Sequence, residues 1–179
     1  MRVRADRDAG DVSDCACADL GHAPLRFAFT HMIEIRKISL PVAGIEELRL
    51  EAGEEGYNFL DRLVEDWLNG ENRFDGPGEI FCGAFGEGAL VACGGLNRDQ
   101  FLANPEVGRI RRVYVRRGWR NRGVGEALVR WLLAEARKSF RGVRLRAENA
   151  GAARLYERIG FAPIDDPNAT HILIFNSVI

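Results

Sequence analysis

The chain has 179 residues, of which 46% are hydrophobic and 28% charged, and its 25 Lys and Arg nearly balance 26 Asp and Glu. This length and apolar content are typical of one domain with its own hydrophobic core. The formal net charge of −1 argues against a strongly basic nucleic-acid-binding protein and against a protein with an acidic tail. No segment approaches the ~18 consecutive apolar residues of a membrane span, and the N-terminal MRVRADRDAGD lacks the apolar segment of a signal peptide. We therefore expect a cytoplasmic protein without a membrane partner.

Residues 1–31 contain Gly, Asp and Ala without apolar periodicity, which predicts a disordered or irregular N-terminal extension. At Met32 the pattern changes, and residues 32–179 are predicted to form a single domain. Cys15 and Cys17 in the extension have no second Cys or His pair at ligand spacing, so we expect incidental thiols and no metal site.

The following segments alternate between strand-like and helix-like patterns. Strands are predicted over residues 32–40, 79–85, 89–96, 109–115, 143–147, 161–164 and 171–175. Helices are predicted over residues 45–50, 57–68, 126–140 and 152–159, with an acidic loop over 51–56 between the first two. This order is typical of an α/β or mixed α+β single domain.

Two cysteines, Cys82 and Cys93, lie on the two strands of a hairpin that turns at Gly86-Glu87-Gly88. We expect them to face each other across the hairpin as buried free thiols. No His lies near either of them in the sequence, so nothing here indicates a nucleophilic cysteine.

Chemistry is concentrated in residues 110–125, IRRVYVRRGWRNRGVG, where a strand leads through a glycine-containing loop into a helix. Gly123 and Gly125 let the backbone turn sharply and approach a ligand closely. The helix start adds unpaired N–H groups and the positive end of the helix dipole, a combination that suits a diphosphate. The nearby arginines Arg116, Arg117, Arg120 and Arg122 add permanent positive charge.

Two familiar phosphate-binding motifs do not fit this segment. A Walker-type loop needs Lys followed by Ser or Thr after its last glycine, and a dinucleotide fingerprint needs a third glycine. Neither is present around Gly125. A tight strand-to-helix turn without a ligand stays open as the alternative, although the surrounding arginines favour phosphate binding.

At this point the sequence resembles the GNAT superfamily of acyl-CoA-dependent N-acetyltransferases. Arg120-Asn-Arg-Gly123-Val-Gly125 matches the family signature [RQ]-x-x-G-x-[GA]. Downstream, Asn149-Ala-Gly-Ala152-Ala-Arg-Leu155-Tyr156-Glu-Arg-Ile-Gly160-Phe161 follows the family pattern N-x-x-A-x-x-L-Y-E-x-x-G-F. The resemblance covers residues 32–179 and implies a three-layer fold with a central, mostly antiparallel sheet of about six or seven strands and about four helices.

The resemblance also implies roles for individual residues. The coenzyme A pyrophosphate would be held by the backbone amides of Arg120, Asn121, Arg122, Gly123, Val124 and Gly125. The main chain of Val113 and Val115 would pair with the pantetheine arm, and an amide near Val113 or Tyr114 would polarise the thioester carbonyl. Asn149 would lie beside the pantetheine arm. Tyr156 would protonate the departing thiolate, a role that also suits a Tyr hydroxyl chemically; a core aromatic is the alternative.

The general base is the least defined part of this expectation. Family members often carry a carboxylate on the strand before the signature, whereas this chain has Arg109, Arg111 and Arg112 there. Glu54 and Glu55 are the nearest substitutes, because the loop between the first two helices usually lines the acceptor side. Tyr57 and Asn97 are candidates to border that pocket. A base acting through water, or an amine that arrives neutral, stays open.

Acetyl-CoA and an amine acceptor are therefore the expected partners, in a direct ternary-complex transfer without a metal. A CoA-binding regulatory module without turnover is the alternative function. Nucleic-acid binding ranks last because no recognition helix or aromatic platform accompanies the arginines. A homodimer is left open, and so is the identity of the acceptor amine.

The charge is divided unevenly along the chain. Residues 42–108 contain 14 acidic and 4 basic side chains, whereas residues 109–158 contain 15 basic and 4 acidic ones. The basic half coincides with the predicted site for a polyanionic cofactor, and the acidic half includes the loop expected to meet a cationic amine.

Overall fold

The computed structural model describes residues 33–175. The predicted extension over residues 1–31, with Cys15 and Cys17, lies outside the described residues, as do residues 176–179.

Strands and helices alternate along the described residues in the predicted order. The strands are β1 (Ile33–Lys37), β2 (Ile80–Gly86), β3 (Ala89–Arg98), β4 (Val107–Val115), β5 (Gly142–Leu145), β6 (Ala162–Pro163) and β7 (His171–Ile174). The helices are α1 (Ile45–Glu54), α2 (Phe59–Asn69), α3 (Val124–Ala136) and α4 (Ala150–Ile159), and a short 3-10 helix, η1, spans Arg117–Trp119. The predicted mixed α/β class is confirmed.

The element boundaries differ from the predicted ones by up to four residues, and at the end of α1 the difference turns a predicted loop into helix. Helix α1 continues to Glu54, so part of the segment predicted as an acidic loop forms its last turn. The glycine at position 53 is unfavourable inside a helix. Contacts of Glu51 and Glu55 with the segment after β4 offset that preference, and such contacts are not visible in the local sequence.

All seven strands form one sheet in the order β1-β2-β3-β4-β5-β7-β6. Every neighbouring pair is antiparallel except β4 and β5, which run parallel. The sheet is therefore mostly antiparallel, as expected, with a single parallel pair at its centre.

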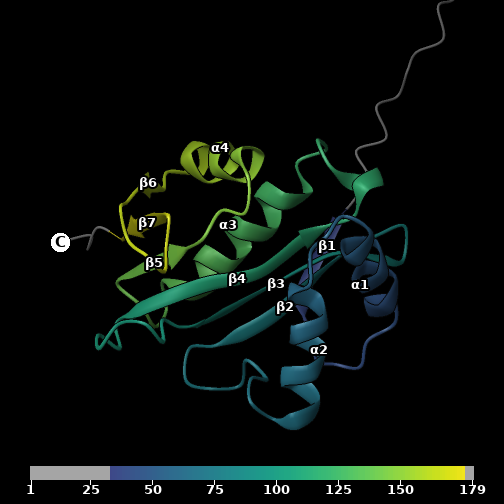
Figure 1. Ribbon diagram of the computed structural model, residues 1–179, viewed down its shortest axis with the longest axis horizontal. Coiled ribbons are helices and arrows are strands. Elements are labelled where there is room, and N and C mark those ends of the chain that lie inside the picture. The colour runs from purple at the N-terminus through teal and green to yellow at the C-terminus, as the bar shows by residue number, and fades with distance from the viewer. Residues whose placement is uncertain (1–32, 176–179) are drawn as a thin grey trace, which may run out of the picture. The chain divides into compact units, whose positions relative to one another are not determined.

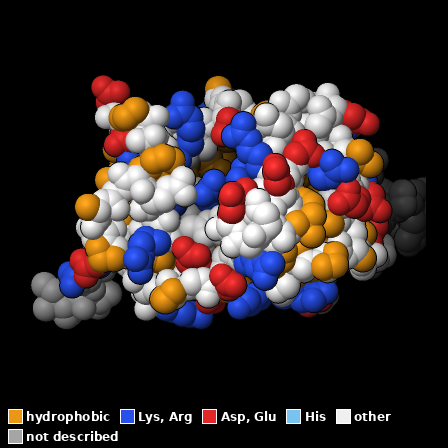
Figure 2. All heavy atoms as spheres, turned by 60° about the horizontal axis from the view of Figure 1, so that its bottom comes forward, with side chains coloured by type: hydrophobic (Ala, Val, Ile, Leu, Met, Phe, Trp, Pro, Cys, Tyr) orange, Lys and Arg blue, Asp and Glu red, His pale blue; other side chains and the backbone are white. Residues whose placement is uncertain are grey.

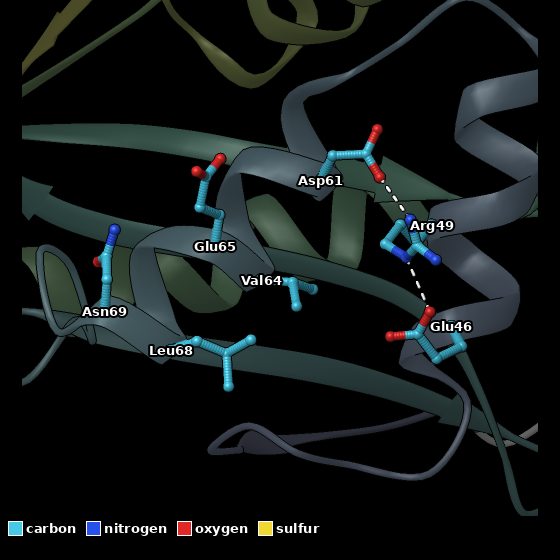
Figure 3. Close-up of a pocket in the computed structure, with 7 residues that line it drawn as sticks. All are labelled: Glu46, Arg49, Asp61, Val64, Glu65, Leu68 and Asn69. Carbon is cyan, nitrogen blue, oxygen red and sulfur yellow. Dashed lines mark hydrogen bonds and ion pairs between the residues drawn. The ribbon is translucent and has the colours of Figure 1, made fainter.

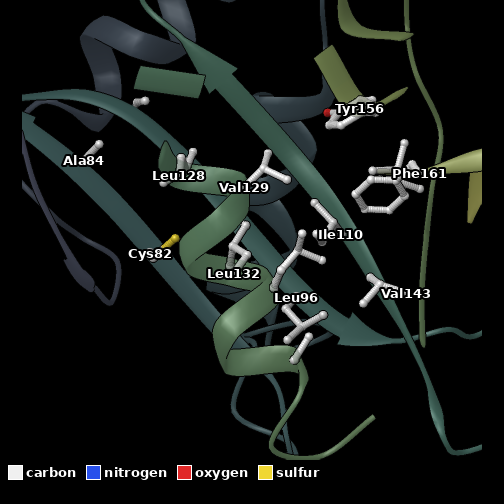
Figure 4. Close-up of a cluster of buried hydrophobic side chains, with 14 of the residues drawn as sticks. Cys82, Ala84, Leu96, Ile110, Leu128, Val129, Leu132, Val143, Tyr156 and Phe161 are labelled. Atoms are coloured by element: carbon white, nitrogen blue, oxygen red, sulfur yellow. The ribbon is translucent and has the colours of Figure 1, made fainter. Parts of the chain in front are cut away.

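Helices cover both faces of this sheet and give three layers (Figure 1). On one face, α3 packs its apolar side onto the sheet and forms a cluster that includes Leu128, Leu132 and Val143 (Figure 4). On the other face, α1 and α2 form a second cluster with Leu48, Leu60 and their neighbours. Burial of this much apolar side chain on both faces stabilises the sheet.

The two hairpin cysteines do not face each other, contrary to the expectation from the sequence. Cys82 aligns with Gly94 and Cys93 aligns with Gly83, so their side chains point to opposite faces of the sheet. Cys82 lies in the cluster under α3, whereas Cys93 lies in the cluster under α1 and α2. Both are free and buried, and burial raises the pKa of the Cys93 thiol to about 12.

Candidate functional site

The parallel pair β4 and β5 separates after a short contact. The strands pair only at Val107 with Gly142, Gly108 with Val143, and Arg109 with Arg144. Strand β5 then ends at residue 145, whereas β4 continues for six residues to residue 115. Over that length β4 keeps its pairing with β3 but has no β5 partner. Its free edge, which includes the predicted residues 113–115, is therefore available to an extended ligand.

A bulge in β4 lies on the same segment. Arg112 and Val113 together oppose Gly94 of β3, and Arg112 has the left-handed φ of 61°. The extra residue changes the alternation of side chains. Arg112 reaches α2, where its Nη2 lies 3.0 Å from Oδ2 of Asp66, while Val113 packs with the α3 cluster. The bulge thus directs Arg111 and Arg112 toward the α2 face and returns the following valines to the α3 face.

The loop after η1 leads into α3 through two residues with left-handed φ, Asn121 at 59° and Gly123 at 80°. Gly123 caps α3, and no side chain bonds to the amides of the first turn. The N–H groups of Val124 and Gly125 have no acceptor within the helix, because the first intrahelical bond runs from Ala127 to the Gly123 carbonyl. A Cβ added to Gly123 would meet nothing within 4 Å, so the space beside the Gly123 Cα is open.

The arginines of the loop are bonded to α1. Arg120 donates two hydrogen bonds of 2.8 and 2.9 Å to the Glu55 carboxylate and a third, from Nε, to the Val115 carbonyl. The Arg117 amide donates to Glu51 at 2.6 Å, and its guanidinium pairs with Glu54. These arginines therefore fix the shape of the loop. The groups left to receive an anion are the backbone amides at the start of α3 and the guanidinium of Arg122, which lies over the Trp119 ring.

The structure places Glu54 and Glu55, the two candidate bases, beside the loop arginines. The hydrogen bonds from Arg120 lower the pKa of the Glu55 carboxyl, and a 2.8 Å bond from the Tyr114 hydroxyl has the same effect. Burial and these carboxylates raise the pKa of Tyr114. Glu55 is thus a stable anion that links α1 to the loop, which disfavours it as a proton acceptor near neutral pH.

The start of α4 brings two more predicted residues together. Asn149 Oδ1 accepts a 2.9 Å bond from the Ala152 amide and so caps α4. Its Nδ2 donates to the Tyr57 hydroxyl at 3.1 Å, which joins the start of α4 to the segment between α1 and α2. The sequence predicts each residue near the site, but the contact between them depends on the fold.

Tyr156 lies about two helical turns further along α4, at the edge of the α3 cluster, where its ring meets Phe161 edge to face (Figure 4). It is only 6% exposed, and this burial raises the pKa of its hydroxyl to about 12. The residue is therefore both a core aromatic and a protonated hydroxyl, and these two interpretations are compatible.

The other candidate for the acceptor pocket is part of the packed interior. Asn97 is buried and donates to Asn72 Oδ1 at 3.0 Å and to Glu79 Oε2 at 2.9 Å. Arg144 and Arg146 were not among the predicted site residues, although they alternate with the apolar residues of the strand and its end. Arg144 is buried between Asp99 and Asp166.

A hollow of about 440 Å³ between α1 and α2 lies away from these groups (Figure 3). It is open to solvent, and its lining cation, Arg49, bonds to Glu46 and Asp61 at 2.7 Å each. These ion pairs leave the arginine of this hollow neutralised, whereas the first amides of α3 have no acceptor within the helix.

Residues 33–175 contain neither a candidate membrane-spanning helix nor a candidate metal-binding cluster. No helix in that range is long and apolar enough to cross a membrane. The same residues contain no group of three His, Cys, Asp or Glu placed to hold a metal ion.

Comparison with solved structures gives many matches of the same fold. A candidate acetyltransferase from Exiguobacterium sp. 255-15 is 26% identical with a TM-score of 0.73, over 80% of this chain and 93% of that one. A GCN5-related N-acetyltransferase from Kribbella flavida is 19% identical (TM-score 0.61; 78% and 95% covered). Glucosamine-6-phosphate N-acetyltransferase from Arabidopsis thaliana is 20% identical (TM-score 0.55; 78% and 97% covered). A search of curated protein sequences finds no significant match.

The model of the acetyltransferase (GNAT) family matches residues 42–161, more than half of the chain. The match includes the free edge of β4, the loop before α3 and the start of α4 with Tyr156. The chain belongs to the GNAT family of acetyltransferases and is an acyltransferase.

Proposed function

We propose that this enzyme transfers the acetyl group of acetyl-CoA to a primary amine of a small molecule or peptide. The observation that carries the proposal is the free edge of β4, which leads through the loop to the start of α3, where the N-cap Gly123 offers no side chain to the helix amides. One extended, anionic ligand can pair with the strand edge and place a diphosphate on the helix amides at the same time. Coenzyme A has this shape and charge.

In this proposal the loop and the strand hold different parts of acetyl-CoA. The amides of residues 120–125 bind the pyrophosphate, and the main chain of Val113 and Val115 pairs with the pantetheine arm. Asn149 lies beside that arm. The amide of Val113 or Tyr114 donates to the thioester carbonyl, where negative charge develops during attack. The ion pairs of Arg117 and Arg120 with α1 support this proposal, because they hold the loop in shape before the ligand arrives.

The transfer proceeds by direct attack in a ternary complex. The neutral amine nitrogen forms a bond with the thioester carbonyl carbon, and the carbon–sulfur bond then breaks to release the CoA thiolate. Tyr156 donates a hydrogen bond to that sulfur and supplies its proton, which the hydroxyl regains from water. Because the Tyr156 pKa is raised to about 12, the hydroxyl is protonated and ready to donate throughout the neutral range.

The proton of the attacking amine needs an acceptor. Glu54 and Glu55 remain candidates by position, but both bond to arginines, and the lowered pKa of Glu55 makes it a weak base. We therefore favour the alternative left open by the sequence, in which the amine reaches the site neutral or loses its proton through water.

The direct test is release of free thiol from acetyl-CoA across a panel of small amines and peptides. We expect release that depends on the amine and formation of one N-acetyl product per thiol, measured by mass spectrometry. Tight CoA binding without thiol release on any amine would instead support a regulatory module.

Replacement of Gly123 by Val tests the loop. The side chain enters the open space beside the Gly123 Cα, so we expect CoA affinity to fall at least about tenfold, by loss of about 1.4 kcal/mol of binding. Gly70→Val is the matched control, because Gly70 has φ 82° against 80° and ends α2. Calorimetry and thermal unfolding of both variants separate lost binding from backbone strain. Wild-type affinity in folded Gly123→Val would refute the assignment.

Replacement of Tyr156 by Phe tests the proposed proton donor. We expect kcat to fall by about 100-fold with CoA affinity and thermal unfolding nearly unchanged. Burial disfavours the phenolate and raises the pKa to about 12, so the wild-type rate should show no loss of the Tyr156 proton below about pH 11. The pH dependence of kcat checks this point. An unchanged kcat in the folded variant would contradict the role.

A further inference from the structure

Four arginines lie in two rows beside the point where β4 and β5 separate. Arg109 and Arg144 occupy the last paired position, and Arg111 and Arg146 follow two residues later on their segments. Val143 and Leu145 of β5 point into the α3 cluster, so the arginines that alternate with them point to the opposite face. Contacts with one loop support this placement, because Arg109, Arg144 and Arg146 all bond to residues 166–168.

The inner pair, Arg109 and Arg144, is neutralised by one buried and one partly exposed carboxylate. Asp99 is fully buried, and its Oδ2 lies 3.5 Å from Arg109 and 3.3 Å from Arg144. Asp166 lies 2.6 Å from Arg144 on the other side. These contacts hold β4 and β5 together at their paired end, and the carboxylates balance the charges of Arg109 and Arg144.

The outer pair has only neutral partners. The Nη1 of Arg111 lies 3.5 Å from Oε1 of Gln100, and Nη1 of Arg146 donates to the Pro167 carbonyl at 2.9 Å. Within residues 33–175, neither guanidinium has a carboxylate in ion-pair contact. Two positive charges thus stand at the opening without a counter-charge from the described part of the protein.

The surroundings of Arg111 make a bound anion favourable. The side chain is half-buried, and burial lowers its pKa, with further contributions from the neighbouring charges of Arg112 and Arg109. Arg112 is paired with Asp66, which lies too far from Arg111 to form an ion pair with it. A carboxylate or phosphate oxygen would restore hydrogen bonds and charge balance to a guanidinium that has lost part of its hydration.

This pair is also close to the proposed reaction centre. Arg111 precedes Val113 by two residues, about 7 Å along a strand. On the face that carries α1 and α2, Lys and Arg side chains lie around a hollow in the upper middle, with Asp and Glu side chains beside them (Figure 2). An amine that reaches the thioester from this face would carry a group a few bonds away within reach of the guanidinium.

We propose that the acceptor amine carries an anionic group, a carboxylate or a phosphate, and that Arg111 and Arg146 bind it beside the β4–β5 opening. The proposal rests on the proposed acetyl transfer and specifies its substrate class. It also gives a reason for the arginines on this strand: their charge serves recognition of the acceptor rather than removal of its proton.

The test compares kcat/KM for matched amines that differ only in the anion. Amino acids against their amides test a carboxylate, and glucosamine 6-phosphate against glucosamine tests a phosphate. We expect the anionic member of at least one pair to be favoured by about tenfold or more. In Arg111→Gln and Arg146→Gln this ratio should fall toward one, whereas Arg111→Lys should retain part of it. Arg137→Gln, which removes the same charge from the end of α3, should keep the wild-type ratio.

The outcomes separate the two proposals. Thiol release with equal kcat/KM for anionic and neutral partners overturns the anion site and leaves acetyl transfer standing. An anionic preference that survives in both folded Gln variants overturns the assignment to these arginines. Absence of thiol release with every amine overturns acetyl transfer and this proposal with it. Because Arg146 is exposed, its variant keeps the test decisive if Arg111→Gln fails to fold.

Discussion

The parting of β4 from β5 is the constraint on which the rest of the structure depends. The two strands are held together at one end, where buried Asp99 lies between Arg109 and Arg144. Removal of one partner from such a buried network leaves an uncompensated charge, so the arrangement is strongly specified. Beyond this clamp β5 stops and β4 continues, and the sheet gains an open strand edge at its centre rather than at its margin.

Because of the bulge at Arg112, the part of β4 without a β5 partner has different surroundings on the two faces of the sheet. On the face of α3, Val113 and its neighbours pack into the core and keep the strand rigid. On the face of α2, Arg111 and Arg112 point outward together, which regular alternation would not allow. The ion pair from Arg112 to Asp66 holds this geometry. A rigid strand edge and a basic face are thus produced by one extra residue.

Contacts with the end of α1 fix the conformation of the loop before α3. Its arginines bond to Glu51, Glu54 and Glu55 at the end of α1, so the acidic and basic halves of the chain meet at this point. The near-zero net charge conceals this pairing. Because Arg117 and Arg120 are paired with these carboxylates, their charge holds the loop in shape. The uncharged amides of Gly123, Val124 and Gly125 remain available to the ligand.

Periodicity and glycine positions were enough to predict the element order, the hairpin and the strand-to-helix turn, because these depend on local sequence. The extension of α1 through Gly53, the opposite orientations of Cys82 and Cys93, and the pairing of Arg120 with Glu55 depend on tertiary contacts and register. The bulge in β4 could not be predicted from the sequence either, because there is no glycine at its position. The catalytic assignment of Tyr156 stays a prediction, because burial alone is compatible with a structural role.

Amide proton–nitrogen NMR spectra of the protein during titration with coenzyme A test most directly whether the opening of β4 binds acyl-CoA. We expect the largest shift changes in residues 113–125 and at the start of α4 from Asn149, where the strand edge, the loop and the helix would meet the ligand. Residues of the hollow between α1 and α2, such as Glu46 and Leu68, should not change (Figure 3). Changes confined to that hollow, or none at high coenzyme A concentration, would contradict the central claim that the opening of β4 binds acyl-CoA.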